Sequence, residues 1–297
     1  MTNNLDDSHP IVVGVDGSES SAHAVRWAAR EAVRRNTPLR LVHVCYLAPV
    51  RHPKQVPPPP EYLAALLEQG RHWITEATEA ARRAAPDAVV TADVHDGETS
   101  HVLVSESKTA QLLVVGSRGL GGFRSLLVGS VAVAVAAHAR CPVVVMRSGA
   151  EDGVPPEDGH VVVGLDGSEL SDAAMTFGCE AAAARGVPLV ALHTWFDVDV
   201  SATWARLPST IDWDYLQSEE ERDLTVRVGA WQAKFPGVEI RPLVVRDRPG
   251  RALLKHAQDA QLIVVGSRGR GALAGLGLGS VSQTLLHHAE CPVAVVR

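Results

Sequence analysis

The first half of the chain alternates short apolar runs with stretches whose apolar residues recur every three or four positions. The runs, rich in β-branched residues, predict strands, and the recurring positions predict amphipathic helices. Strands are predicted at 11–15, 39–45, 89–94, 112–115 and 142–146. Helices are predicted after a capping Ser18, over 61–85, over 99–108 and from about Ser130. Six prolines between positions 49 and 60 predict an irregular loop over 50–60.

The second half repeats this pattern with a shift of 150 residues. Residues 110–147 and 260–297 are identical at 21 of 38 positions without a gap. Strands are expected at 161–165, 189–192, 241–245, 262–265 and 292–296, with a tryptophan-containing loop over 195–213. The shift indicates a tandem duplication, with one domain over 1–148, a Gly/Pro/acid-rich linker over 149–159 and a second domain over 160–297.

Strands and helices alternate in each half in the order β-α-β-α-β-α-β-α-β. Alternation with apolar strands is typical of α/β proteins, in which helices cover both faces of a parallel sheet. Right-handed crossovers leave few other topologies. We therefore expect two tandem, doubly wound, open parallel five-stranded sheets, and the length of 297 residues agrees with two domains.

Charge and composition narrow the function classes. The chain has 28 Lys and Arg against 34 Asp and Glu, a formal charge of −6, which argues against a nucleic-acid partner because phosphate backbones require clustered positive charge. The four cysteines form no C-x-x-C pair and suit a reducing compartment. The sequence has no signal-peptide pattern and no run of 18 apolar residues, so we expect a cytoplasmic protein without a membrane partner.

A carboxylate follows the first strand of each half. Gly14-Val-Asp16-Gly-Ser18 recurs as Gly164-Leu-Asp166-Gly-Ser168. Ligands of open parallel sheets lie beyond the carboxyl ends of the strands, where such a carboxylate can bond a ribose hydroxyl, coordinate magnesium or act as a base. The alternative is structural, with the aspartate and serine only forming a turn and capping the next helix.

A glycine-rich segment follows the fourth strand of each half. Gly116-x-x-Gly119, nine residues and Gly129-Ser130 recur as Gly266-x-x-Gly269, nine residues and Gly279-Ser280. Glycine lets backbone N–H groups approach an anion closely, and a helix start adds further N–H groups and a positive dipole end. The pattern favours a phosphate site, the alternative being a tight turn with serine as an ordinary N-cap.

These motifs resemble those of the universal stress protein family, in its tandem-domain, ATP-binding form. The resemblance rests on the G-2x-G-9x-G-(S/T) spacing, the strand-end aspartate and the closing x-Pro-Val-x-Val strand, and it covers most of the chain. It implies a Rossmann-like fold of the adenine nucleotide alpha hydrolase type and one ATP site per half, with Mg²⁺ accompanying the phosphates.

The resemblance also implies which residues form the two sites. Around adenine and ribose it places Gly14, Asp16, Val44 and Val115 in the first half, and Gly164, Asp166, Thr194 and Val265 in the second. Around the phosphates it places Gly116, Gly119, Gly129, Ser130 and Val131, and then Gly266, Gly269, Gly279, Ser280 and Val281. Thr194 departs from its counterpart Val44, and its hydroxyl near the adenine edge would either form a hydrogen bond or weaken apolar packing.

Other side chains leave alternatives open. Arg118, Arg268, Arg124 and Arg270 either pair with phosphate or are solvated surface charges. The repeated histidines, His43 and His193 after the second strand and His138 and His288 ending the last helix, are typical of structural roles. Cys141 and Cys291 are expected to begin a buried strand as apolar fillers. The tryptophans at 195, 204, 213 and 231 either pack in a core, the favoured interpretation, or form a partner surface.

Three functions are compatible with these sequence features. The favoured one is a nucleotide-binding stress-response regulator without catalytic residues or a metal site of its own. The second is an ATP-using enzyme, either a slow hydrolase or a nucleotidyl or phosphoryl transferase; neither a P-loop nor a G-x-S-x-G elbow is present. The third is an interaction scaffold whose sites have lapsed. The family resemblance also implies a homodimer, or a pseudo-dimer of the two halves within one chain.

Overall fold

The computed structural model describes residues 9–46, 59–120, 128–147, 159–195, 212–270 and 277–297. The chain divides into two compact units, 1–154 and 155–297. Residues 149–158 of the predicted linker, and the loop predictions over 50–58 and 196–211, lie outside the described residues. Gly159, the last residue of the predicted linker, is buried against the carbonyl of Asp259 in unit 2.

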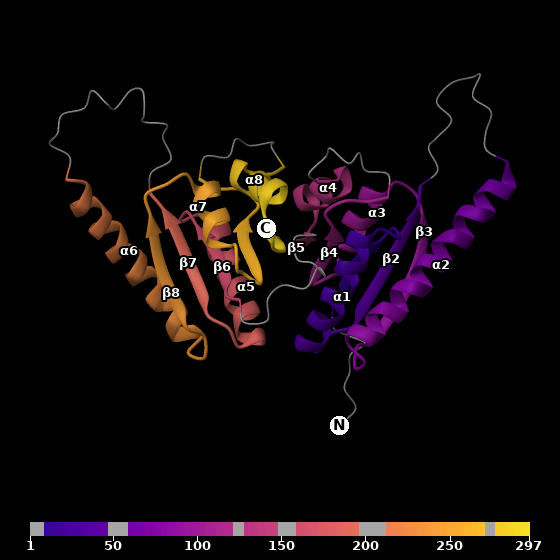
Figure 1. The fold of residues 1–297 in the computed structure, drawn as a ribbon, viewed down its shortest axis with the longest axis horizontal. Coiled ribbons are helices and arrows are strands. Elements are labelled where there is room, and N and C mark those ends of the chain that lie inside the picture. The colour runs from indigo at the N-terminus through magenta and orange to yellow at the C-terminus, as the bar shows by residue number, and fades with distance from the viewer. Residues whose placement is uncertain (1–8, 47–58, 121–127, 148–158, 196–211, 271–276) are drawn as a thin grey trace, which may run out of the picture. The chain divides into compact units, whose positions relative to one another are not determined.

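Unit 1 has the predicted alternation of strands and helices (Figure 1). Its elements are β1 (Ile11–Val15), α1 (Glu19–Arg34), β2 (Leu39–Cys45), α2 (Pro60–Ala84), β3 (Val90–Asp96), α3 (Thr99–Glu106), β4 (Leu112–Gly116), α4 (Ser130–His138) and β5 (Val143–Met146). Helix α2 begins at Pro60, which the sequence assigned to the loop, because proline fits the first turn of a helix, where its missing N–H costs nothing.

Unit 2 has the same order. Its elements are β6 (Val161–Leu165), α5 (Glu169–Arg185), β7 (Leu189–Thr194), α6 (Trp213–Lys234), β8 (Ile240–Val245), α7 (Pro249–His256), β9 (Leu262–Gly266), α8 (Ser280–His288) and β10 (Val293–Val296). Strand β7 continues two residues beyond the predicted Leu192, because its polar last residues, His193 and Thr194, still pair with β8.

Each unit contains a parallel sheet of five strands, which confirms the expected fold class. In unit 1 the strand order is β3-β2-β1-β4-β5, and in unit 2 it is β8-β7-β6-β9-β10. The order reverses direction beside β1 and β6, so the loops after β1 and β4, and after β6 and β9, leave neighbouring strand ends. A ligand crevice of an open α/β sheet forms at such a reversal.

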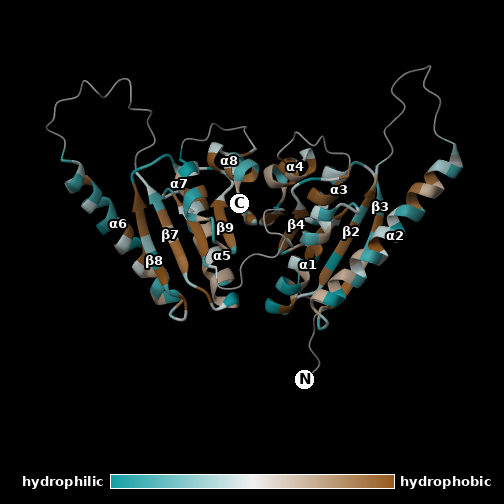
Figure 2. Cartoon of the chain, in the orientation of Figure 1, coloured by the Kyte–Doolittle hydropathy of each residue, from teal (hydrophilic) through white to brown (hydrophobic). Residues whose placement is uncertain are grey.

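Burial follows the place of each strand in its sheet. Strands β1, β4, β6 and β9 are almost wholly buried, whereas β3 and β8 are edge strands with several exposed residues. Pro242 lies in β8, where an edge strand tolerates the missing N–H. Figure 2 shows the same division, with hydrophobic strands inside each unit and hydrophilic outer faces on the long helices α2 and α6.

The helices pack differently on the two sheets. In unit 1, α1 and α2 lie along each other, and α3 packs with α4. In unit 2, α7 packs with α8, but α6 packs mainly on β8. The buried residues of α6 include only Leu224 and Val228, although it has 22 residues. The environment of the loop after β6 therefore differs from that of the loop after β1.

Candidate functional site

A cavity of about 540 Å³ lies at the carboxyl ends of the strands of unit 2. Its volume is within the range of small-molecule sites, roughly 300–1,000 Å³. The cavity brings together all nine residues that the sequence singled out in the second half, from the loops after β6 and β9, the end of β7 and the start of α8. They are Gly164, Asp166, Thr194, Val265, Gly266, Gly269, Gly279, Ser280 and Val281.

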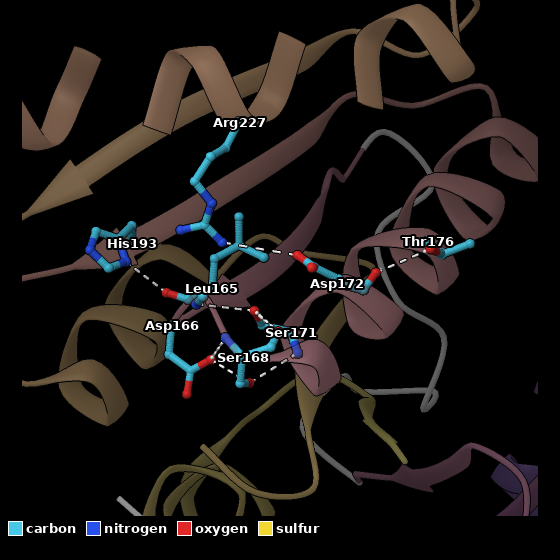
Figure 3. A network of polar contacts seen from close by, with 9 residues as sticks. Leu165, Asp166, Ser168, Ser171, Asp172, Thr176, His193 and Arg227 are labelled. Atoms are coloured by element: carbon cyan, nitrogen blue, oxygen red, sulfur yellow. Dashed lines mark hydrogen bonds and ion pairs between the residues drawn. The ribbon is translucent and has the colours of Figure 1, made fainter. Parts of the chain in front are cut away.

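Asp166 is fixed in the turn after β6 by the serine two residues later. The backbone N–H and the hydroxyl of Ser168 donate to Oδ1 of Asp166 at 3.0 and 2.7 Å. The turn passes through Gly167 with a φ of +79°, a conformation that glycine adopts without strain. Ser168 also caps α5, since its hydroxyl accepts from the N–H of Ser171 at 3.2 Å (Figure 3). The structural interpretation of the serine is therefore correct, and the carboxylate still lines the cavity.

The charge of Asp166 is stabilised despite partial burial. Burial raises the pKa of Asp166, but the hydrogen bonds from Ser168 and Arg270 and the charge of the Arg270 guanidinium outweigh it and lower the pKa below its ordinary value. The bond from Arg270 is donated by its backbone N–H to Oδ2 at 2.9 Å. Asp166 is thus an ionised hydrogen-bond acceptor at neutral pH, which suits a ligand hydroxyl.

Unit 1 has an equivalent turn with a different neighbour. The N–H and hydroxyl of Ser18 donate to Oδ1 of Asp16 at 3.0 and 2.6 Å. Gly17 has a φ of +78°, and the indole of Trp73 lies against it. Within the described part of the chain, Oδ2 of Asp16 accepts no hydrogen bond, unlike Oδ2 of Asp166.

The glycines of the second motif have separate roles. Gly116 packs against the backbone of α1, where a Cβ would overlap the Ser20 hydroxyl, and Gly266 packs against Leu170 of α5. Gly119 and Gly269 face the aspartates, because a Cβ on either would lie 2.5 Å from Oδ2 of Asp16 or Asp166. The first glycine is thus needed for packing, and the second for the close approach of the loop to the carboxylate.

Helices α4 and α8 begin without a side-chain cap. Their N-cap residues are Gly129 and Gly279, and neither helix has a side-chain hydrogen bond at the cap. The interpretation of Ser130 and Ser280 as ordinary N-caps is therefore wrong: both serines are exposed in the first turn. In unit 2 the residues of that first turn line the cavity, so the N-terminal N–H groups of α8 are near any bound anion.

The remaining predicted residues of unit 1 occupy matching places. Val44 and Val115 are buried at the ends of β2 and β4, and Val131 is half-buried in the first turn of α4. Gly14 packs against Leu103 of α3, as Gly164 packs against Leu253 of α7. The residues of this unit come from the same loops and strand ends as the nine cavity residues of unit 2.

The described arginines near the glycine motif are exposed in both units. Arg268 and Arg270 are exposed and line the cavity of unit 2. Arg118 is exposed in unit 1, and Arg124 lies outside the described residues. Burial, together with the guanidinium of Arg118, lowers the pKa of Arg147 at the end of β5. Positive charge therefore accompanies the glycine loop in both units.

Two histidines contribute to the sites in a way that the sequence did not indicate. His43 and His193 lie within β2 and β7, not after them. Nδ1 of His43 contacts the carbonyl oxygen of Val15 at 2.7 Å. Nδ1 of His193 contacts the carbonyl oxygen of Leu165 at 2.8 Å (Figure 3). Those carbonyls immediately precede Asp16 and Asp166. His193 also lines the cavity, and its Nε2 lies 3.4 Å from Glu220 of α6. The sequence signal that could have identified these histidines is their recurrence at the 150-residue shift.

The other cysteines, histidines and tryptophans match their predicted places only in part. Cys141 and Cys291 are buried, as expected. They lie two residues before strands β5 and β10, which begin at Val143 and Val293. His138 and His288 end α4 and α8, as expected. The described tryptophans of unit 2 at positions 195, 213 and 231 are half-buried, so the core interpretation is only partly correct, and position 204 lies outside the described residues.

Neither a metal cluster nor a membrane-spanning helix is found in the described part of the chain. Within the described ranges, no group of three or more His, Cys, Asp or Glu side chains is arranged to hold a metal ion. No helix among the same residues has the length and apolar character needed to cross a membrane.

Comparison with known proteins identifies the family. The universal stress protein family matches residues 8–147 and again 159–297. The universal stress protein Rv2623 of Mycobacterium tuberculosis is 43% identical over 294 residues, which cover 97% of this chain and 96% of the relative. Rv2005c of the same organism is 38% identical, covering 97% of each chain. The crystal structure of a universal stress protein from Archaeoglobus fulgidus is 22% identical, with a TM-score of 0.71 and 98% of each chain covered, and shares the fold. The chain belongs to the universal stress protein family, whose domain it contains twice in tandem.

Proposed function

We propose that each unit binds one ATP and that the chain is a nucleotide-dependent regulator of the stress response. The observation that carries the proposal is the cavity of unit 2, where an ionised Asp166, the glycine loop and the uncapped start of α8 meet. The carboxylate suits a ribose hydroxyl, and the helix N-terminus suits phosphate. The Mg²⁺ that accompanies ATP is held chiefly by the phosphates, as is usual for this ion.

The same geometry supports regulation over catalysis. Asp166 is the only strand-end carboxylate among the described residues that line the cavity, and its lowered pKa makes it a weak base. Phosphoryl transfer also requires a positioned nucleophile. We therefore propose that bound ATP changes a conformation or an interaction of the chain and is not turned over. Phosphate release well above background, lost on Asp166→Ala with ATP binding retained, would instead support an enzyme.

Calorimetric titration of nucleotide-stripped protein with Mg-ATP tests the proposal, with two sites per chain expected. The Gly269→Ala variant should lose the site of unit 2, because its Cβ would lie 2.5 Å from Oδ2 of Asp166. Gly237→Ala is the matched control, since a Cβ there meets no atom within 4 Å. Absence of binding in the folded wild-type protein would overturn the proposal. Sedimentation with and without ATP tests the expected self-association, which stays a prediction.

A further inference from the structure

The two proposed sites differ at the residue that follows the second motif glycine. Unit 2 has Arg270 at this position, and unit 1 has Leu120, which is 59% exposed. Both residues follow the same Gly-Ser-Arg-Gly sequence, so this side chain is the first at which the two loops differ. The role of Arg270 argued below rests on the proposed binding of a nucleotide in the cavity of unit 2.

Arg270 extends from the glycine loop back to the turn that carries Asp166. Its backbone N–H holds Oδ2 of Asp166 at 2.9 Å, which fixes the start of the side chain. Its guanidinium lies over Gly167: a Cβ on that glycine would overlap Nη2 and lie 2.9 Å from Cζ. The same side chain lines the cavity and is exposed. A guanidinium is thus placed between the turn that carries Asp166 and the glycine loop.

A second arginine restricts where this guanidinium can lie. Nη1 of Arg227, on α6, would be 3.2 Å from the same Cβ, and Arg227 lies 4.0 Å from Asp172 on α5 (Figure 3). Arg227 is therefore attracted toward Asp172, on one side of the turn. Arg270 is the one of these two side chains that lines the cavity.

Unit 1 has a neutral group in the corresponding place. The indole of Trp73, from α2, covers Gly17, and a Cβ there would lie 2.5 Å from its Cε2. Trp73 also meets His43 edge to face, with ring centroids 5.2 Å apart. The turn of unit 1 is thus covered by an aromatic ring and that of unit 2 by a cation.

We infer that Arg270 makes the site of unit 2 selective for the number of phosphates on the nucleotide. Each added phosphate increases the negative charge near the loop, and a guanidinium forms strong, paired hydrogen bonds with phosphate oxygens. Adenine and ribose contacts are common to AMP, ADP and ATP, so the difference among these ligands falls on the cations beside the phosphates. Such a site responds to the ratio of ATP to AMP and not only to total adenine nucleotide.

The test compares ATP and AMP affinity at the site of unit 2 alone. Gly119→Ala serves as the background, because its Cβ would displace the carboxylate of Asp16, and binding should fall to one nucleotide per chain. In that background Arg270→Leu should reduce the ratio of ATP to AMP affinity by about tenfold, given the strength of charge-assisted bonds. Arg270→Lys should give an intermediate ratio. Arg222→Leu, an exposed arginine of α6 that pairs with Glu219, is the control and should leave the ratio unchanged.

The outcomes separate this inference from the proposed function. Loss of all nucleotide binding in the Gly119→Ala background, with Arg270 intact, would overturn the proposed site and the inference together. Binding of ATP and AMP with the same affinity ratio before and after Arg270→Leu would overturn the inference and leave the proposed site standing. Circular dichroism of each variant confirms that the exposed substitutions leave the fold intact.

Discussion

The indole of Trp73 lies against Gly17, so a Cβ added at position 17 would lie 2.5 Å from Cε2 of the ring. Gly17 also has a φ of +78°, which L-residues rarely adopt. The glycine between Asp16 and Ser18 is therefore required twice, once by the turn and once by the helix that covers it. The counterpart Gly167 is required by the same turn, with a φ of +79°, whereas the Arg270 guanidinium beside it ends a flexible, exposed side chain that can shift.

Substitution of Gly17 by alanine should destabilise unit 1 by about 3 kcal/mol, because left-handed strain and overpacking against the indole add together. Gly186→Ala separates the two contributions: Gly186 has a φ of +67°, but a Cβ there meets nothing within 4 Å. We expect a loss of about 1 kcal/mol for that control. Urea unfolding, with hydrogen exchange to assign the change to a unit, measures both. Equal losses would show that the indole does not oppose a side chain.

Alanine substitution of two helix glycines, Gly70 and Gly229, should change stability in opposite directions. Gly70 lies in α2, where a Cβ would be 2.5 Å from Cδ2 of His43, and His43 is held by its contact with the Val15 carbonyl. Gly70→Ala should therefore destabilise unit 1 by about 1 kcal/mol or more, despite the better helix propensity of alanine.

The matched substitution is in α6 of the other unit. Gly229 lies within this helix, and a Cβ there meets no atom within 4 Å. Gly229→Ala should stabilise unit 2 by about 0.5–1 kcal/mol, which is the propensity difference alone. Hydrogen exchange of each helix measures both changes. Stabilisation by both substitutions would contradict the packing of His43 on α2.

The fold was predictable from the sequence because its strands are apolar and its helices periodic. The run at 11–15 and its repeat at 161–165 identify the central strands, and the spacing of the glycines identifies the loops beside them. Periodicity does not predict which side chains of different helices and strands are in contact. It places Trp73 on a helix but not over Gly17, and it places His193 beside a strand end but not against the Leu165 carbonyl.

The difference between the two units was hidden for a related reason. Gly70 and Glu220 occupy the same position at the 150-residue shift, and their effect depends on the histidine that each faces. In unit 1 the glycine lets His43 approach the helix, whereas in unit 2 Glu220 lies 3.4 Å from His193. Aligning the two halves of the sequence shows that Gly70 is replaced by Glu220. Only the packing of α2 and α6 shows that this replacement changes the contact with the histidine of the neighbouring strand.

Ser20 should anchor the glycine loop of unit 1. Its hydroxyl donates to the Arg118 carbonyl at 2.9 Å and accepts from the Arg118 N–H at 3.2 Å, and Leu170 replaces it in unit 2. Ser20→Ala leaves the Arg118 N–H without this partner, while the Arg118 carbonyl keeps the Ser18 hydroxyl at 3.2 Å, and should cost about 1 kcal/mol of unfolding free energy. Amide exchange at Arg118 should accelerate as well.

The control for this substitution is an exposed serine. Among the residues that the structure describes, the hydroxyl of Ser218 contacts only carbonyls of its own helix, those of Asp214 and Tyr215. Ser218→Ala should change stability by less than about 0.5 kcal/mol, as is usual for surface positions. A loss at Ser20 no larger than this would show that its hydroxyl does not hold the loop.

The buried thiols should make stability fall at alkaline pH. Burial raises the pKa of Cys141 and that of Cys291 to about 12, and the pKa of Cys179 to about 11. The unfolded chain loses these protons near pH 8.5, so the contribution to stability is complete below that pH and declines as pH rises toward 12. Between pH 8.5 and its own folded-state pKa, each thiol adds a slope of about −1.4 kcal/mol per pH unit.

Cys141→Ala isolates this effect from other alkaline titrations. The variant loses some packing at every pH, but its unfolding free energy should decline less steeply than that of the wild type between pH 9 and 11, by the slope of one thiol. Because both proteins share every other titrating group, the difference between their slopes reports Cys141 alone. Urea unfolding at several pH values measures it. Identical slopes would mean that the Cys141 thiol ionises as readily in the folded protein as in the unfolded chain, and rapid modification of the native thiol by a disulfide reagent at pH 8 would agree with that result.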